Sequence, residues 1–506
     1  MTSQSSKNIK IGVIITYITR FFSVGISLFY VPIMLGKLGQ VEYGLYALVQ
    51  SIVSYLQMSE MGIGTTATRY NSKYIAENDK DGQKTINGMF FVLYLLIALF
   101  CALVSGIIYY FLPSIYSAYS QASILLIKKL FLTAIGNLLI TFVFKIFNSI
   151  IISYEKFIFI KALALIQTIL GPVGMLIVLY MGAGSVGMLA VTTIISLVFG
   201  IIQSVYCFST LKISFDFTHF KKELFVAIFK FTSFVFLNSL ANQLFVNTDK
   251  IIVSIIMNET AVAIYAIVLQ FDIYFVNFSN LITQFYLPKL TKSISKNSGD
   301  LSEALFEIKR ISKFQIIIAG FIFGGFISIG KPFITLWIGN DYNIAYYLII
   351  LQFLTDYLSA SQSMFEPLMQ ALNLHKGRAI IAIAFAMLKV VFTTVLVIMI
   401  GLFGCVIAYV LIFIIRLIAY NIYYNKKAEI DIKSYYKYII KIYMSVTLCL
   451  GIAAGALYFV QKVVAINSYP VLFAAALVFV LLYVSGVFWF VLSRNERNTV
   501  FGMIKK

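Results

Sequence analysis

Residues 43–70 read YGLYALVQSIVSYLQMSEMGIGTTATRY, an apolar segment that becomes polar within the length expected of one membrane span. Its first part, 43–54, has the composition of a membrane helix. The remainder contains Glu60, two glycines, three threonines and Arg69. A carboxylate in hydrocarbon is costly, so this part of the span must border protein or a water-filled cavity.

The composition places the whole chain in a membrane. Of its 506 residues, 61% are apolar and 12% are charged, about half the charged share of ordinary globular domains. Apolar runs long enough to cross about 30 Å of hydrocarbon recur to the end of the sequence. The short alternating segments of a transmembrane barrel are absent from it. We therefore predict an all-α polytopic membrane protein with about 14 transmembrane helices, near residues 10–35, 43–68, 86–112, 124–153, 157–181, 185–208, 224–248, 262–287, 309–334, 343–371, 378–400, 404–424, 437–459 and 469–492.

Motifs for catalysis, cofactors or metals are missing from the sequence. No phosphate-binding glycine-rich loop ends in Lys-Ser or Lys-Thr, and neither His219 nor His375 has a second ligand at metal-binding spacing. The four cysteines fall in apolar spans, where we expect buried, unpaired thiols. The N-terminal MTSQSSKNIK leads into a long span without a cleavage site, so we expect the first helix to be its own insertion signal. The prediction is a protein that is not an enzyme and has no catalytic residue, cofactor or metal.

The distribution of basic residues predicts the orientation. With the N-terminus in the cytoplasm, 28 of the 39 basic residues fall in cytoplasmic segments and six fall on the other side. This asymmetry follows the positive-inside rule and explains most of the +19 net charge without a nucleic-acid partner. We expect both termini in the cytoplasm and external loops at 36–42, 113–123, 182–184, 331–342 and 460–468.

Weak internal repeats divide the chain. SKYIAENDKD (72–81) aligns with TKSISKNSGD (291–300), and YALV (46–49) aligns with YAIV (265–268), both at an offset of 219 residues. These matches occur in the same order in both halves of the sequence and at one offset. They therefore predict two six-helix lobes in a parallel, pseudo-two-fold arrangement, as in transporters that move substrate between rocking halves. The predicted divisions are an N-lobe (1–208), a basic cytoplasmic linker (209–223), a C-lobe (224–425) and two C-terminal helices with a cytoplasmic tail (426–506).

Charged residues inside the predicted spans are the candidate site. A charge at mid-bilayer costs at least about 2.5–3.5 kcal/mol, so such residues pair with one another or line a wet cavity. Static pairs, such as Arg20 with Glu60 or Lys389 with Asp356, are one interpretation, and Lys230 can also reach the interface. Basic residues in both lobes favour the other interpretation, a shared cavity for an anion. The predicted cavity residues are Arg20, Lys145, Lys230, Lys389 and Arg416.

Two further groups of polar residues complete the candidate site. Glu60 and Arg69 are predicted at the cytoplasmic entrance of the cavity. The adjacent glycines, Gly62 and Gly64, indicate either a loosened cavity wall or close helix packing. Asp249, Asp272 and Asp356 are candidates for coupling transport to protons or sodium ions. The membrane potential is an alternative energy source that needs no such residue.

A family resemblance accompanies these features. LGKLGQVEYGLYALVQSIVSYLQMSEMGIGTTATRY (35–70) resembles the N-terminal signature of bacterial polysaccharide flippases, which include the O-antigen and capsule repeat-unit exporters of the multidrug/oligosaccharidyl-lipid/polysaccharide superfamily. NTDKIIVSIIMNETAVAIYAIV (247–268) resembles the opening of the second lobe in that family. The resemblance covers roughly residues 10–425. It does not identify the sugar.

The resemblance implies a flippase that moves a polyprenyl-diphosphate-linked oligosaccharide from the inner to the outer leaflet of the bacterial cytoplasmic membrane. It also implies that an arginine in the first helix, here Arg20, holds the diphosphate. Membrane lipids, a polysaccharide polymerase and glycosyltransferases are the implied partners. Fourteen helices resemble the lipid II flippase branch, whereas many repeat-unit flippases have twelve. The alternatives are a multidrug or cation antiporter on the same fold and a membrane glycosyl- or acyltransferase.

The predicted orientation can be tested by cysteine labelling in intact cells. A membrane-impermeant thiol reagent should label a single cysteine at position 119, in the loop 113–123, but not one at position 297. The positive-inside asymmetry is the physical reason. The reverse labelling pattern would invert the orientation.

Overall fold

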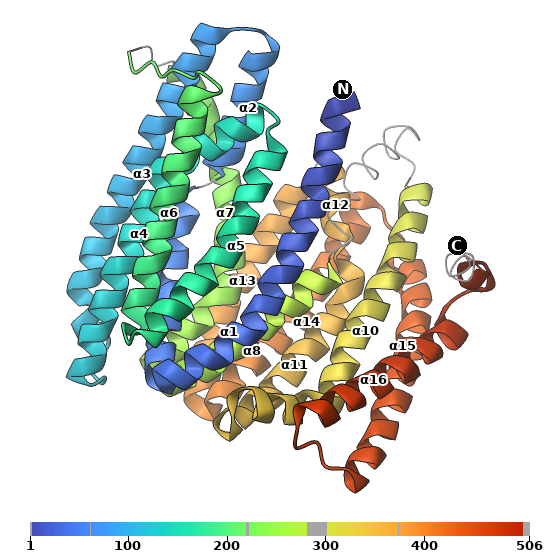
Figure 1. Cartoon of the computed structure of the whole chain (residues 1–506). Helices are drawn as coiled ribbons and strands as arrows, with labels where there is room; N and C mark the ends of the chain where they lie inside the picture. The colour runs from blue at the N-terminus through green and yellow to red at the C-terminus, as the bar shows by residue number, and fades with distance from the viewer. Residues whose placement is uncertain (1–2, 61, 219–221, 281–300, 373, 499–506) are drawn as a thin grey trace. The chain divides into compact units, whose positions relative to one another are not determined.

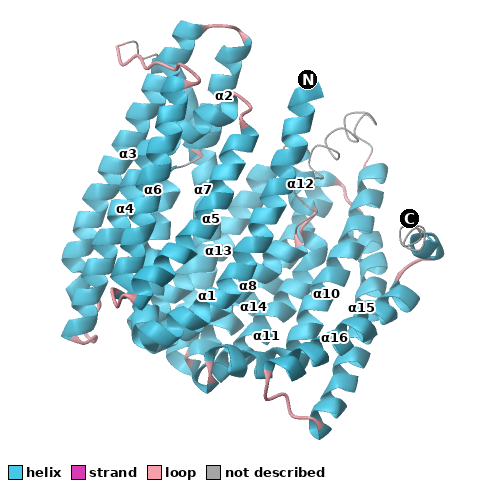
Figure 2. Ribbon diagram, viewed as in Figure 1, coloured by secondary structure: helices cyan, strands magenta, loops and turns pink. Residues whose placement is uncertain are grey.

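Every regular element that the structure describes is a helix (Figure 2). The structure is a computed structural model and describes residues 3–60, 62–218, 222–280, 301–372 and 374–498. Within these ranges, some helical residues, Arg20 and Lys230 among them, are described by backbone alone. His219, position 297 and the second repeat copy at 291–300 lie outside the described residues or side chains.

The helices follow the chain in the order shown in Figure 1. The first part contains α1 (Ser3–Gln57), α2 (Ile63–Ala76), α3 (Lys80–Ile115), α4 (Gln121–Ser153), α5 (Phe157–Tyr180), α6 (Gly184–Ser209) and α7 (Lys222–Ile256). The second part contains α8 (Glu259–Ser279), α10 (Ser302–Ile338), α11 (Asn343–Ser359), α12 (Phe365–Ala371), α13 (His375–Ile400), α14 (Leu402–Ala428), α15 (Ile432–Val463) and α16 (Tyr469–Gly486). Single short turns of helix, η1 (Met58–Glu60), η3 (Asn340–Tyr342), η4 (Ala360–Gln362) and η5 (Val487–Val491), adjoin them.

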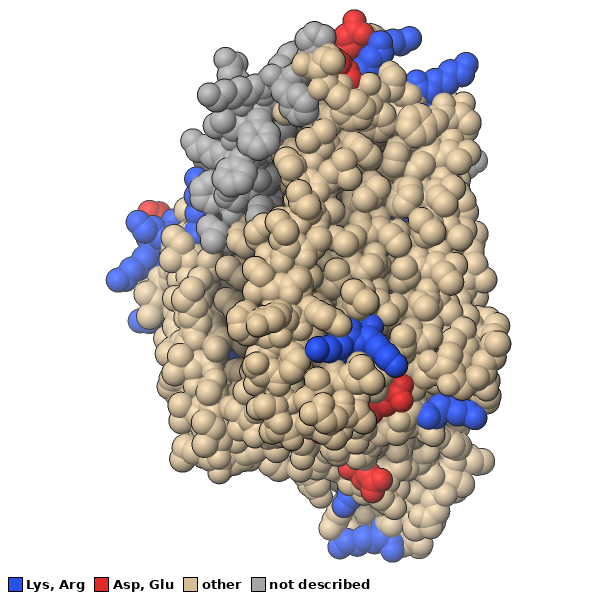
Figure 3. All heavy atoms as spheres, turned by 90° about the vertical axis from the view of Figure 1, so that its left-hand side faces the viewer, with Lys and Arg blue, Asp and Glu red and all other residues tan. Residues whose placement is uncertain are grey.

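The predicted fold class, an all-α polytopic membrane protein, is confirmed. Twelve helical segments in the described residues are long and apolar enough to span a membrane. One of them, Phe22–Ala76, includes both sides of the bend in α1, and the 35-residue α7 is a further long helix. Many large apolar side chains on these helices are exposed. Figure 3 shows one such face, largely uncharged, with charged side chains at its upper rim and in its lower part. The four cysteines are buried and unpaired, as expected.

The first two predicted helices meet within α1. The backbone of Gly39 is not helical, so the chain turns there from one helix into the next, inside the predicted loop at 36–42 but with a shorter connection. Gly39 has φ 73° and ψ 174°, a backbone conformation that glycine adopts without steric penalty. The helix predicted over 43–68 is interrupted, since α1 ends at Gln57 and α2 begins at Ile63. This break lies inside the polar stretch with which the sequence analysis began.

The chain forms two compact units, residues 1–263 and 264–506, which we call the N-unit and the C-unit. In the N-unit, α4 packs against α1, α2, α3 and α6, while α5 packs against α1 and α6. The helix α7 contacts α1 and α2 and therefore belongs to the N-unit. The lobe boundaries drawn from the repeats, with the linker at 209–223, stay a prediction.

Glycines allow close helix packing in the C-unit. In this unit α10 packs against α11, α15 and α16, and α13 forms an antiparallel hairpin with α14. A Cβ atom on Gly320 would lie 2.6 Å from a methyl group of Val446, and one on Gly324 would lie 2.6 Å from Leu450. Both contacts are with α15. The sequence GFIFG (320–324) thus seats α10 against the C-terminal pair of helices by the small-xxx-small pattern.

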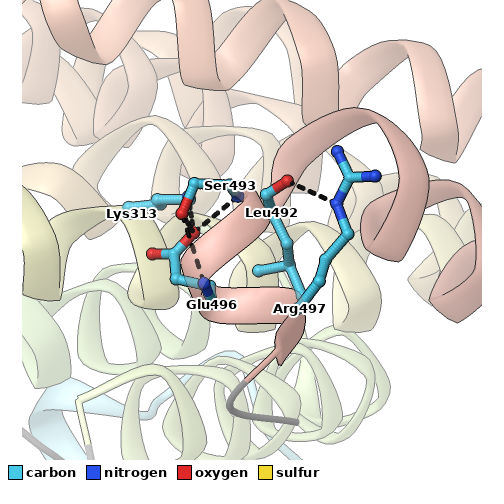
Figure 4. A network of polar contacts seen from close by, with 5 residues as sticks. All are labelled: Lys313, Leu492, Ser493, Glu496 and Arg497. Atoms are coloured by element: carbon cyan, nitrogen blue, oxygen red, sulfur yellow. Dashed lines mark hydrogen bonds and ion pairs between the residues drawn. The ribbon is translucent and has the colours of Figure 1, made fainter. Parts of the chain in front are cut away.

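A polar network fastens the C-terminal segment to α10 (Figure 4). The ammonium of Lys313 donates a hydrogen bond of 2.6 Å to Glu496 Oε2, and the backbone N–H and hydroxyl of Ser493 each donate one of 2.8 Å. The guanidinium of Arg497 donates to the carbonyl of Leu492 and lies over the ring of Trp489. Burial acts to raise the pKa of Glu496, but the hydrogen bonds from Lys313 and Ser493 outweigh it and lower the pKa.

Replacing Glu496 with glutamine should destabilise this attachment at neutral pH. Because the folded-state pKa is lowered, the ionised carboxylate contributes stability above its ordinary pKa, and this contribution is lost as the pH falls through the lowered value. Glu496→Gln should reduce stability by about 1–2 kcal/mol at pH 7 and match the wild type at low pH. Thermal unfolding of the purified protein between pH 7 and pH 3 measures the loss of stability at neutral pH and its disappearance at low pH.

The matched control for this experiment is Glu77→Gln. The carboxylate of Glu77 is exposed and lies 3.9 Å from Lys73, so its loss should change little at any pH. A stability difference for Glu496→Gln that persists unchanged at low pH would contradict the prediction.

Candidate functional site

The break between α1 and α2 satisfies its own polar groups. Gly62 adopts a left-handed conformation, φ 71°, directly before α2. The hydroxyls of Thr65 and Thr66 donate to the carbonyl of Gly62 at 2.8 and 3.1 Å, and the hydroxyl of Thr68 donates to the carbonyl of Gly64 at 3.0 Å. The threonine-rich run is therefore compatible with a membrane, because its hydroxyls return to the backbone of their own helix.

Glu60 forms an ion pair at this break. Its Oε2 lies 3.2 Å from the ammonium of Lys145 on α4, and the hydroxyl of Tyr94 on α3 donates to its Oε1 at 3.4 Å. Gly64 leaves the space for the carboxylate, since a Cβ atom there would lie 2.9 Å from Glu60 Oε1. The structure thus joins a predicted entrance residue to a predicted cavity residue. Glu60, Tyr94 and Lys145 are called the Glu60 cluster below.

The Glu60 cluster is only partly buried. The side chain of Glu60 is 25% exposed and that of Lys145 is 39% exposed. Lys145 lies eight residues before the end of α4, roughly 12 Å along a helix about 50 Å long. From there an ammonium can reach the headgroup region. The pair therefore marks a place where the N-unit meets water or headgroups rather than hydrocarbon.

The other predicted residues of the N-unit lie apart from this cluster or outside the described side chains. Arg69 is exposed on α2, in line with a surface position. Asp249 is fully buried on α7 and acts electrostatically on Tyr55. The backbones of Arg20 and Lys230 lie in α1 and α7, and their side chains are outside the described part of the structure. Their predicted role in a cavity stays a prediction.

The C-unit brings two predicted carboxyl groups together. Asp272 on α8 accepts a hydrogen bond of 2.9 Å from the amide of Gln352 on α11, and Asp356, one turn further along α11, accepts one of 3.0 Å from the hydroxyl of Tyr409 on α14. The carboxyl groups of Asp272 and Asp356 are close enough to interact. Both are buried, with exposures of 8% and 3%. These four residues are called the carboxyl cluster.

Predicted cations lie beside the carboxyl cluster. The ammonium of Lys389 on α13 lies 5.5 Å from the ring centre of Tyr409, and this lysine is 1% exposed. The guanidinium of Arg416 on α14 lies 5.5 Å from the ring centre of Phe413 and 5.9 Å from that of Tyr420. Lys389 and Arg416 are near the middle of their helices, where Lys389 is buried and Arg416 is half-buried.

Sequence reasoning missed a second arginine in this region. Arg378, at the start of α13, pairs with Glu366 on α12 at 3.2 Å and lies 5.1 Å from the ring centre of Tyr420. Tyr420 therefore contacts both Arg378 and Arg416. Arg378 is the first residue of the span predicted at 378–400, and a basic residue at the start of a span gives no indication of its partner. Glu366 inside a predicted span was the available signal.

The described residues contain no group of three or more histidine, cysteine or carboxylate side chains able to hold a metal ion. In both units, spanning helices carry positively charged side chains, and the neighbours of these side chains are carboxyl groups and tyrosines. Such an arrangement can bind and release anions or exchange small cations.

A family model described as a polysaccharide biosynthesis protein matches residues 9–292. The chain belongs to this family. One relative across nearly the whole length is the uncharacterized membrane protein EpsK of Bacillus subtilis (strain 168), 20% identical over 497 residues, which are 96% of this chain and 95% of EpsK. The resemblance stated from the sequence is thereby confirmed for the polysaccharide family.

Two kinds of solved structure share the fold. The lipid II flippase MurJ in an inward closed conformation superposes with a TM-score of 0.72 at 18% identity, covering 94% of this chain and 98% of MurJ. A multidrug resistance MATE family transporter in an inward-facing conformation superposes with a TM-score of 0.57 at 14% identity, covering 81% of this chain and 96% of that protein. At these identities the similarity establishes the fold.

The Glu60–Lys145 pair can be tested by a double-mutant cycle. Glu60→Gln and Lys145→Met each leave one charge at the helix break without its partner, so each should lower the thermal stability of the purified protein. The double variant should be more stable than the sum of the single effects predicts, with a coupling of about 0.5–3 kcal/mol. Additive effects would show that the two charges do not stabilise each other.

Proposed function

We propose that this protein is a flippase that moves a polyprenyl-diphosphate-linked oligosaccharide from the inner to the outer leaflet of the cytoplasmic membrane, for cell-surface polysaccharide synthesis. Family membership and the fold shared with MurJ and MATE transporters support a transporter over an enzyme. The observation that carries the proposal is the positive charge of Lys389 and Arg416 at the centre of α13 and α14.

The chemistry of the substrate explains why such charges are useful. A diphosphate is a compact polyanion that cannot cross hydrocarbon unaided, because the loss of its hydration is not compensated there. Cationic groups inside a wet passage lower this barrier, and arginine in particular contacts phosphate oxygens with two parallel hydrogen bonds. No covalent bond changes during translocation, so the function needs no catalytic residue. Arg20, Lys145, Lys230, Lys389 and Arg416 are the residues proposed to meet the anion.

The proposed mechanism is alternating access between the lobes predicted at 1–208 and 224–425, joined by the linker at 209–223. Glu60 and Arg69 are proposed at the cytoplasmic entrance, and both termini are proposed to be cytoplasmic. A polysaccharide polymerase and glycosyltransferases are the proposed partners, since they consume and supply a lipid-linked oligosaccharide. The helices of 426–506 are predicted to lie outside the two lobes. In the structure, α15 and α16 pack against α10 within the C-unit.

A second candidate is a flippase for a lipid II-type peptidoglycan precursor. The TM-score of 0.72 with MurJ over 94% of this chain favours it specifically. Both candidates share a polyprenyl diphosphate and differ in what is attached to it. The species that accumulates when the protein is depleted distinguishes them, since a peptide-bearing disaccharide identifies the second candidate. Unchanged lipid-linked intermediates together with raised sensitivity to cationic drugs would point instead to a multidrug antiporter.

The role of Arg20 provides the sharpest test of the proposal. Arg20→Ala should abolish polysaccharide export and cause a lipid-linked oligosaccharide to accumulate, while the protein remains in the membrane. Arg20→Lys should retain part of the export, because an ammonium keeps the charge but loses the two-point contact with phosphate. Mass spectrometry of extracted lipids and immunoblots of membranes measure these outcomes.

A matched control removes another positive charge from the same helix. Lys37 lies on α1 with its ammonium 4.6 Å from the ring centre of Tyr180, at an end of the span where no substrate contact is proposed. Lys37→Ala should keep export near the wild-type level. Normal export in Arg20→Ala, at normal protein levels, would contradict the proposed role.

A further inference from the structure

The corner between α14 and α15 carries an excess of positive charge. Residues 426–441 contain five lysines and two carboxylates, a net charge of +3, and all seven side chains are exposed. One of the carboxylates, Asp431, is occupied at the start of α15, where it accepts a hydrogen bond of 3.1 Å from the backbone N–H of Ser434. No ion pair among the described residues involves the lysines, which are Lys426, Lys427, Lys433, Lys437 and Lys441. This corner therefore attracts anions.

The surface around this corner has the layout of a lipid molecule. The 32 residues of α15 extend about 48 Å, more than the roughly 30 Å of hydrocarbon, so its first turns lie at headgroup depth. Lys433 and Lys437 are the second and sixth residues of α15, and Lys426 and Lys427 lie in the last turn of α14. Further into the membrane, each helix continues as a stripe of exposed apolar side chains, Met444, Leu448 and Ile452 on α15 and Leu411, Ile415, Ile418 and Ile422 on α14. Cations above apolar stripes match an anionic head above acyl chains.

A tyrosine hydroxyl at this corner has a proton that no described residue accepts. The oxygen of Tyr436 accepts hydrogen bonds of 2.7 Å from the amide of Gln362 in η4 and 2.8 Å from the amide of Asn421 on α14. Because both amides donate to the oxygen, the phenol proton points away from them, and the structure gives it no acceptor. The carbonyl oxygen of Gln362 does not accept it either, since that atom has no hydrogen-bond partner.

This hydroxyl is held in place beside a lysine. Tyr436 is half-buried, and its two bonds to different elements fix the position of its oxygen. Lys433 lies three residues earlier on α15, and side chains three residues apart are neighbours on a helix surface. A fixed O–H group and a mobile ammonium next to it can contact two oxygens of one phosphate group, and such charge-assisted hydrogen bonds are strong.

We propose that the corner of α14 and α15 binds the phosphate of an anionic membrane phospholipid such as phosphatidylglycerol. Tyr436 and Lys433 hold the phosphate, the other lysines supply the attraction, and the acyl chains follow the apolar stripes. Juxtamembrane lysines favour anionic lipids in this way. A phosphatidylcholine headgroup also has a phosphate, but its quaternary ammonium is repelled by the net positive charge of the corner. The proposal holds whether or not the protein flips an oligosaccharide.

Lipid binding by the purified, full-length protein in detergent tests this proposal. Phosphatidylglycerol and phosphatidylcholine with the same acyl chains are titrated separately, with the melting temperature and the lipid retained in native mass spectrometry as readouts. Phosphatidylglycerol should give a saturable rise in melting temperature of a few degrees. Phosphatidylcholine should bind at least tenfold more weakly.

Variants of the corner locate the binding site. Lys433→Gln combined with Lys437→Gln should weaken phosphatidylglycerol binding at least tenfold, and Tyr436→Phe should weaken it severalfold without any change of charge. Lys433→Arg combined with Lys437→Arg should keep the binding, and Lys433→Gln alone serves if the double glutamine variant does not fold. The matched control is Lys80→Gln combined with Lys212→Gln, which removes two exposed lysines of the N-unit and should bind phosphatidylglycerol as the wild type does.

Two results would each overturn the proposal. An equal loss of binding in the corner variants and in the Lys80 and Lys212 control, or no loss in either, would show that phosphatidylglycerol responds to general surface charge. A polyprenyl phosphate has similar headgroup chemistry and is titrated in the same way. If it binds more tightly than phosphatidylglycerol and the Tyr436→Phe substitution weakens it, the corner receives a polyprenyl carrier instead of a membrane phospholipid. Both readouts are independent of polysaccharide export, so this proposal and the proposed function fail separately.

Discussion

Hydrocarbon does not solvate charge, and this constraint explains most of the polar contacts in the structure. A charged group within a spanning helix must find its partner inside the protein or reach water. Glu60 and Lys145 do both, since they pair with each other and remain partly exposed. Asp356 is buried and receives the hydroxyl of Tyr409. The hydroxyls of Thr65 and Thr66 return to the backbone of their own helix.

The same environment also changes what holds the helices together, because in a membrane close packing replaces the burial of apolar surface from water. Lipid tails are as apolar as leucine, so helices in a membrane associate through small residues and complementary surfaces. Gly320 and Gly324 bring α10 into contact with α15 in this way. Aromatic side chains fill the remaining space, as where Phe271 contacts Phe326 and Trp337 at 5.5 Å between ring centres. These rings pack α8 against α10 directly beside Asp272, which follows Phe271 in the chain.

Much of the fold could be predicted from the sequence, because apolar runs of membrane length have few alternative structures. The turn at Gly39 lies within the predicted loop at 36–42, but the break between α1 and α2 was harder to place. A glycine in a span is compatible with a straight helix, and only the surrounding packing decides whether the chain turns there. The residue types of the site were equally visible, since a charge in a span stands out against an apolar background.

The partners of those charges were less predictable. Pairing depends on which helix faces are in contact, and this information is spread over the whole unit. The sequence analysis offered Arg20 as a partner of Glu60 and did not offer Lys145, which the structure places 3.2 Å from it. Gln352 had a detectable signal, because it lies one turn from Asp356 in an apolar helix. Tyr409 had none, since it is one of 33 tyrosines in the chain and most of them serve packing.

The two halves of the chain treat their intramembrane charges differently, although the sequence analysis predicts that they are repeats of one lobe. At the 219-residue offset, Glu60 corresponds to Ser279 and Asp272 corresponds to Val53, so neither carboxylate has a charged counterpart in the other half. The Glu60 cluster lies at a helix break and is partly exposed, whereas the carboxyl cluster lies within continuous helices and is buried beside a lysine. A partly exposed pair can exchange partners with an incoming ligand at little desolvation cost, while a buried group changes charge or partner only when its surroundings move.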